Sequence, residues 1–184
     1  MLQGWVALTG TPGVGKTTVA KTLAHRGVRR VDLGEFVDFY ELAEGFDEER
    51  GSGIVDPKKV PKALKQVLQS GERVLLDSHW SHEVPGVKGA IVLRCRPAQL
   101  RERLLARDWS QNKIRENVEA EAIDLVLQEA VKKLGRTRVW EIDGTGRPTR
   151  DVAADVLSIL EGTATADAFR PGQVDWSRDI MAGL

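Results

Sequence analysis

The sequence lacks the features that mark a membrane protein, a disulfide-bonded protein or a nucleic-acid-coating protein. It contains one cysteine, Cys95, so no disulfide can form within the chain, which suits a reducing compartment. No apolar run approaches the ~20 residues that span a bilayer, and the first residues form a predicted strand rather than a signal peptide. Lysine plus arginine equals aspartate plus glutamate, at 27 each, so no net charge draws the chain to RNA or lipid. We therefore expect a single-domain cytoplasmic protein without membrane contact.

A glycine-rich stretch, Gly10-Thr-Pro-Gly-Val-Gly-Lys16-Thr17, fits the phosphate-binding pattern G-x-x-x-x-G-K-[ST]. An apolar predicted strand at 5–9 precedes it, and residues 18–24 follow with helical spacing. Backbone N–H groups of such a loop form a nest for phosphate at a helix N-terminus. In this pattern Lys16 reaches the β- and γ-phosphates, and Thr17 places its hydroxyl on Mg²⁺. The strand–loop–helix context favours a phosphate site over the alternative, a glycine turn without a ligand.

Strands and helices alternate along the rest of the chain, which predicts a parallel α/β fold with right-handed crossovers. The expected strands lie at 5–9, 28–33, 72–78, 90–95 and 138–142. The third of these ends in Asp77, and an acidic residue at that point is the second P-loop signature, near the phosphates and Mg²⁺. We expect Asp77 to hold Mg²⁺ through water or to orient the nucleophile, with a turn acid as the alternative. His79 follows it, and imidazole chemistry permits proton shuttling near neutral pH.

Helix boundaries and loops follow from local signals. Asp56 and Thr149 are expected to cap helices. Ser110 is expected to cap a long helix that runs to about Leu134. The acidic, glycine-rich stretch at 44–53 is interpreted as a surface loop or, in a nucleotide kinase, as a mobile acceptor-binding segment.

Several side chains are given expected roles from their positions in the sequence alone. Arg107 precedes the break at 108–110, which indicates a mobile segment, so we expect it to close on the phosphates. Arg94, near a strand's carboxyl end, is expected to join it. Three further side chains are interpreted as surface residues: Arg103, His25 and His82. The tail at 163–184 either packs on the domain or frays.

Four motifs together resemble one known family. They are the loop at 10–18, Asp77-Ser78-His79, the Arg107-Asp108-Trp109 break, and Glu116-Asn117 with Glu121 beyond. From about residue 4 to 160 the chain resembles adenylate kinases of the sixth-isoenzyme type, small P-loop proteins of archaea and eukaryotic nuclei.

That resemblance implies a P-loop kinase domain at 1–162, followed by the tail at 163–184. The implied fold is the five-stranded parallel sheet of nucleoside monophosphate kinases with helices on both faces, an acceptor-binding segment near 32–55 and a lid near 106–116. The implied residues are Gly13, Gly15, Lys16, Thr17, Thr18 and Arg107 for ATP, Lys16, Asp77 and His79 for catalysis, and Thr17 and Asp77 for Mg²⁺.

The resemblance also implies activity and partners. It implies phosphoryl transfer from ATP to AMP or another nucleoside monophosphate, ATPase activity, and a role in small-ribosomal-subunit maturation through a platform ribosomal protein. The alternative is a partner-stimulated ATPase with little kinase activity. One departure concerns the acceptor segment, because residues 36–39 contain no arginine where eukaryotic members carry one. Neutral overall charge argues against RNA as the sole anchor, and the acidic run at 47–49 suits a basic protein.

Overall fold

A computed structural model of the chain describes residues 2–47, 52–69, 72–165 and 167–181. At its centre five parallel strands lie in the order β2-β5-β1-β6-β7. Their bounds are Trp5–Thr9 (β1), Arg29–Asp32 (β2), Val74–Asp77 (β5), Gly89–Arg94 (β6) and Val139–Asp143 (β7). The predicted five-stranded parallel α/β fold is therefore confirmed. The carboxyl ends of the strands share one edge, where ligands of such sheets bind.

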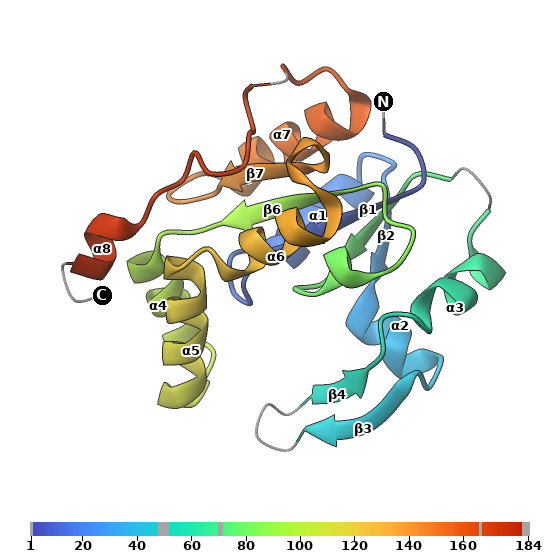
Figure 1. The fold of residues 1–184 in the computed structure, drawn as a ribbon, viewed down its shortest axis with the longest axis horizontal. Helices are drawn as coiled ribbons and strands as arrows, with labels where there is room; N and C mark the ends of the chain where they lie inside the picture. Colours follow the sequence, from blue (N-terminus) through green and yellow to red (C-terminus); the bar gives the residue numbers. More distant parts are fainter. Residues whose placement is uncertain (1, 48–51, 70–71, 166, 182–184) are drawn as a thin grey trace.

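Helices cover both faces of this sheet (Figure 1). One face carries α1 (Lys16–Ala24), α4 (Pro97–Leu105), α5 (Gln111–Ala122) and α7 (Thr149–Glu161); the other carries α2 (Leu33–Phe39), α3 (Val60–Val67) and α6 (Leu125–Leu134). The period of two along a strand divides the core accordingly. In β1, Val6 and Leu8 pack on the first face, whereas Ala7 packs on the second. In the described part of the chain, no helix is long and apolar enough to cross a membrane.

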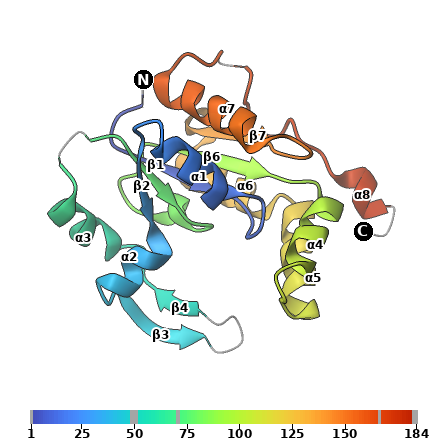
Figure 2. The same ribbon diagram turned by 180° about the vertical axis from the view of Figure 1, so that it is seen from behind.

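The stretch interpreted as a surface loop contains a β-hairpin. Strands β3 (Ala43–Asp47) and β4 (Ser52–Val55) pair antiparallel as a separate two-stranded sheet. The hairpin and α5 project from the same side of the molecule, at opposite ends of it (Figures 1 and 2). The acidic run at 47–49 lies outside the described residues except for Asp47.

Several predicted helix boundaries were wrong. The long helix expected to reach Leu134 is broken at Asp124, which adopts φ 58° and separates α5 from α6. Asp56 accepts from the Lys58 backbone N–H in a turn, and α3 begins only after it. Thr149 is the first residue of α7 and caps nothing, because Pro148 occupies the N-cap. Ser110 does cap α5, since its Oγ accepts from the Lys113 N–H at 3.3 Å.

The tail packs on the domain, as one of the two alternatives predicted. Phe169 packs against the first core, and Trp176 is 9% exposed. The Phe169 carbonyl accepts from the Glu141 N–H at 2.9 Å, which attaches the tail to the edge strand β7. Short helix α8 (Ser177–Met181) follows, and its Asp179 pairs with Arg96 at 2.8 Å.

Candidate active site

The glycine-rich loop joins β1 to α1 in the shape predicted from its sequence. Gly15 is the N-cap of α1 with φ 114°, a conformation that strains any residue with a Cβ. Gly13 has φ 97°, and a Cβ there would lie 2.6 Å from Leu104 Cδ2. The loop therefore fits under α4 only with glycine at position 13.

Lys16 begins α1 and folds back over the loop. Its Nζ donates to the carbonyl oxygens of Gly10 at 2.6 Å and Thr11 at 3.0 Å. The pKa of Lys16 is lowered to about 8, mainly by burial and also by Arg107, against the opposing effect of the carboxylates of Asp77 and Glu121. A phosphate at the loop would favour the charged ammonium. The Lys16 ammonium therefore lies at the loop, and its contact with phosphates stays a prediction.

Thr17 and Asp77, the predicted Mg²⁺ ligands, lie at the start of α1 and at the end of β5. Thr17 is exposed at the N-terminus of α1, and so is Thr18. Asp77 ends β5, pairs in register with Leu8 next to the loop, and is 3% exposed. Mg²⁺ prefers oxygen ligands and is usually held by one or two carboxylates together with substrate phosphates. A hydroxyl and a carboxylate are oxygen donors of the kind such an ion takes, and the assignment of Thr17 and Asp77 as its ligands stays a prediction.

Arg30 is a site residue that the sequence analysis did not identify. It lies in β2, and both its Nε and one Nη donate to Asp77 Oδ2, at 3.0 and 2.8 Å. The same Nη also donates to Asp32 Oδ2. Arg30 therefore links Asp77, at the end of β5, to Asp32, the N-cap of α2.

Arg94 does not reach toward the phosphates, contrary to the prediction. It is 1% exposed and binds three carboxylates: Glu121 at 2.7 Å, Glu141 at 2.6 Å, and Asp124. Glu121 continues this cluster to the phosphate loop, because its Oε2 accepts from the Thr11 hydroxyl at 2.6 Å. Arg94 thus joins α5, β7 and the loop through buried charge pairs.

A hollow of about 370 Å³ lies beside the loop on the α4 side. Gly13, Gly15 and Thr18 line it together with three arginines, Arg103, Arg107 and Arg147. Arg107 lines this hollow and its positive charge lowers the pKa of Lys16, while its closure on the phosphates stays a prediction. Arg103 was predicted to be a surface charge, but it is half-buried and donates to the Val14 carbonyl at 3.0 Å.

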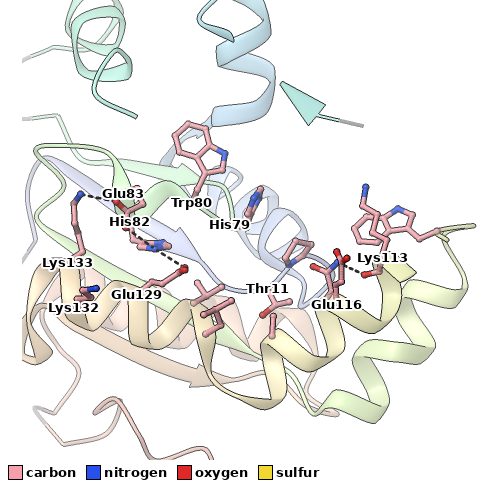
Figure 3. A pocket seen from close by; sticks show the side chains of 16 residues that line it. Thr11, His79, Trp80, His82, Glu83, Lys113, Glu116, Glu129, Lys132 and Lys133 are labelled. Carbon is pink, nitrogen blue, oxygen red and sulfur yellow. Dashed lines mark hydrogen bonds and ion pairs between the residues drawn. The ribbon is translucent and has the colours of Figure 1, made fainter. Parts of the chain in front are cut away.

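A larger cavity of about 1,100 Å³ lies on the other side of the loop, between the segment after β5 and helices α5 and α6 (Figure 3). Thr11, His79 and Trp80 line it, so His79 is at the site, with an exposed side chain. His25 is exposed, as predicted. His82 was also expected at the surface, yet it is 1% exposed, and burial lowers the pKa of its imidazole.

Comparisons with known proteins identify the family of the chain. A family model described as "AAA domain" matches residues 6–124. A protein of Methanocaldococcus jannaschii, provisionally named adenylate kinase, is 35% identical over 94% of this chain and 92% of its own. One of Thermococcus onnurineus with the same name is 39% identical over 95% and 92%.

Solved structures show the same fold at low identity. Shikimate kinase from Bacteroides thetaiotaomicron superposes with a TM-score of 0.52 at 16% identity, over 88% of this chain and 99% of that one. A sulfotransferase from Alicyclobacillus acidocaldarius gives 0.51 at 14% identity, over 97% and 88%. Because the family model covers more than half of the chain and the archaeal relatives align along nearly all of it, the chain belongs to the AAA-domain family of P-loop proteins, together with the archaeal proteins provisionally named adenylate kinase.

Proposed function

We propose that the protein is a nucleoside monophosphate kinase of the adenylate kinase type, which transfers the γ-phosphoryl group of MgATP to AMP or another nucleoside monophosphate. The names of the archaeal relatives support this proposal. The observation that carries it is that the phosphate loop lines two hollows. Gly13 and Gly15 face the smaller one, and Thr11 and Pro12 face the larger one. This arrangement suits a donor and an acceptor that meet at the loop.

Residues in these positions supply what phosphoryl transfer needs, which is mainly positioning and neutralisation of charge. Lys16 and Arg107 neutralise the donor phosphates from two sides. Thr17 and Asp77 would hold a Mg²⁺ ion, which would supply positive charge to neutralise the transferred phosphoryl group. A phosphate oxygen of the acceptor is already anionic and can attack without a base. His79 lies two residues after Asp77 and lines the larger hollow, where it would orient a water if hydrolysis replaces transfer.

The experiment is to measure ADP formation from ATP alone and with each nucleoside monophosphate, with Mg²⁺ present. We expect slow hydrolysis alone and a clear stimulation by at least one monophosphate. If no monophosphate stimulates ADP formation, the kinase proposal is wrong.

A second candidate is an ATPase that a basic protein partner stimulates, acting in small-subunit maturation as the family resemblance implies. The acceptor segment supports it, because residues 31–47 contain six acidic side chains and no lysine or arginine. Phe39 and Phe46 are 79% and 65% exposed on that segment, which adds apolar area for a protein contact. ATP turnover measured with and without the purified platform ribosomal protein tests this candidate. Unchanged turnover together with no binding would contradict it.

A further inference from the structure

The first part of the acceptor-binding segment, residues 31–47, carries only acidic charge, and the cation of the segment, Arg50, follows it in the sequence. Between residues 31 and 47 the chain carries Asp32, Glu35, Asp38, Glu41, Glu44 and Asp47, without any lysine or arginine. A nucleotide phosphate is an anion, and recognition of phosphate in proteins relies on arginine or lysine. Six carboxylates would repel it. A cation must therefore come from outside this stretch.

Arg30 is the arginine nearest in sequence, and its guanidinium lies at the reaction edge of the sheet. It holds Asp77 through Nε at 3.0 Å and one Nη at 2.8 Å, with its side chain 13% exposed. That Nη also contacts Asp32. Among the described residues, the other Nη makes no hydrogen bond, so two of the five N–H donors remain for a further oxygen ligand.

Asp32 is attached in a way that lets Arg30 leave it at little cost. Its Oδ1 caps α2 by accepting from the N–H groups of Gly34 at 3.0 Å and Glu35 at 3.2 Å. Its Oδ2 alone contacts Arg30. If the guanidinium turns from Oδ2 to a phosphate oxygen, the helix cap stays intact and Asp77 keeps its partner at Nε.

We propose that Arg30 binds the phosphate of the acceptor nucleotide, taking the role that no residue of 36–39 can fill. This inference rests on the proposed kinase function. One guanidinium would then contact both the acceptor phosphate and Asp77, which places the attacking oxygen beside the Mg²⁺ carboxylate. Asp32 holds one Nη and places a negative charge beside the phosphate, so the site binds the monophosphate more weakly than an arginine without that carboxylate would.

The test compares two substitutions with opposite expected effects. Arg30→Gln removes the cation, and we expect the Kd for AMP, measured by calorimetry, to rise about tenfold or more, as for loss of a charge-assisted hydrogen bond. Asp32→Asn keeps a side-chain oxygen for the helix cap and removes the competing charge, so the Kd for AMP should fall several-fold. Arg30→Lys should lie between wild type and Arg30→Gln, because lysine keeps the charge and loses the fork.

Two results would overturn the inference. One is a Kd for AMP that Arg30→Gln changes less than twofold. The other is a fall in ATP hydrolysis without acceptor as large as the fall in kcat/KM for AMP, because Arg30 would then act through Asp77 alone. Thermal melts of all three variants show whether they fold. If Arg30→Gln does not fold, the Kd of Asp32→Asn for AMP still tests the proposal.

The same measurements distinguish a failure of the kinase proposal from a failure of the Arg30 proposal. Wild-type protein that binds AMP without phosphorylating it contradicts the kinase function, while the three Kd values still decide the role of Arg30. Wild-type protein that phosphorylates AMP with an unchanged Kd in Arg30→Gln contradicts only the role of Arg30. If wild-type protein binds no monophosphate at all, both proposals are wrong.

Discussion

The two sides of the candidate site are built in opposite ways. On the donor side, the loop is held by buried contacts, with Thr11 bound to Glu121 at 2.6 Å and Lys16 to backbone carbonyls. On the acceptor side, the hairpin β3–β4 extends from the sheet, with Phe46 and Ile54 65% and 53% exposed. Buried hydrogen bonds within the protein hold the donor side in place, whereas the acceptor side exposes apolar and acidic groups to solvent.

This difference indicates which part of the site a ligand must complete. Buried, fully bonded groups resist rearrangement, whereas a segment with few buried contacts opens at low free energy. We therefore expect ATP to bind a loop that is already shaped, and the acceptor segment to adopt its final position only on its ligand or partner. The predictions below test this contrast, from the largest expected effect to the smallest.

Removing the loop cation should have the largest effect. In Lys16→Met we expect ATP turnover to fall by roughly 10²–10³-fold, because the charge facing the transferred phosphoryl group is lost. Steady-state ADP formation measures it. Lys21→Met, on the exposed side of the same helix, is the matched control and should turn over normally. Wild-type turnover in Lys16→Met would refute the phosphate-loop assignment.

Asp77→Asn keeps the shape of the side chain and removes the charge beside Mg²⁺. We expect nucleotide binding to persist while turnover falls about 10²-fold, in line with the loss of one preorganised electrostatic group. Asp38→Asn on the exposed face of α2 serves as the control. His79→Gly should slow hydrolysis more than it weakens ATP affinity. If both variants match wild type, neither residue takes part in the reaction.

The buried cluster behind the loop should govern stability. Glu121→Gln leaves Arg94 short of a charge partner inside the protein, and breaking such a pair costs about 3 kcal/mol of unfolding free energy. Denaturant melts measure this loss. Glu119→Gln is the control, since Glu119 lies on the same helix with its side chain 60% exposed. Equal stability of the two variants would show that the cluster does not hold the loop.

Protonation of Lys16 should appear in the pH dependence of ATP binding. The pKa of Lys16 is lowered from 10.5 to about 8, so at pH 9 the folded protein without nucleotide holds it mostly neutral. Between pH 8 and 10.5 the unfolded chain binds more protons at this site, so its contribution to stability rises with pH in that window. Phosphates favour the ammonium, so ATP binding at pH 9 should take up protons. Calorimetry in two buffers of different ionisation enthalpy measures this uptake, and Lys16→Met should abolish it.

The smallest expected effect lies on the acceptor hairpin. In Phe46→Ser we expect the free energy of unfolding to change by no more than about 0.5 kcal/mol, because the ring is exposed. Binding of a protein partner, if the second candidate function holds, should fall in this variant. A large loss of stability would show that the hairpin packs more firmly than its exposure indicates.

The sequence predicted those features that depend on neighbouring residues. The loop, Lys16, Thr17 and the acid at the end of β5 follow from local spacing and from the order of strand and helix. Their mutual placement then follows from parallel pairing, because Leu8 and Asp77 lie in register. This is why both the fold and the position of the loop could be predicted without coordinates.

The features that were missed depend on residues far apart in the chain. Arg94 looked like a free cation, but its partners Glu121 and Glu141 lie 27 and 47 residues further along. The same arginine binds Asp124, whose left-handed backbone divides the helix that the apolar spacing had predicted as continuous. The hairpin strands contain glycine and acidic residues, which are depleted in strands, so propensity favoured a loop.

The attachment of the tail to Glu141 has a consequence for how the protein is made. Oε1 of Glu141 accepts from Arg94, and Oε2 accepts from the backbone N–H groups of Gly172 at 2.7 Å and Gln173 at 2.9 Å. A nascent chain that has reached only the end of α7 carries every nucleotide-binding motif, yet its buried carboxylate lacks these donors, which is costly. We therefore expect the sheet to form during synthesis and the ATP site to become firm only after residue 173 has left the ribosome.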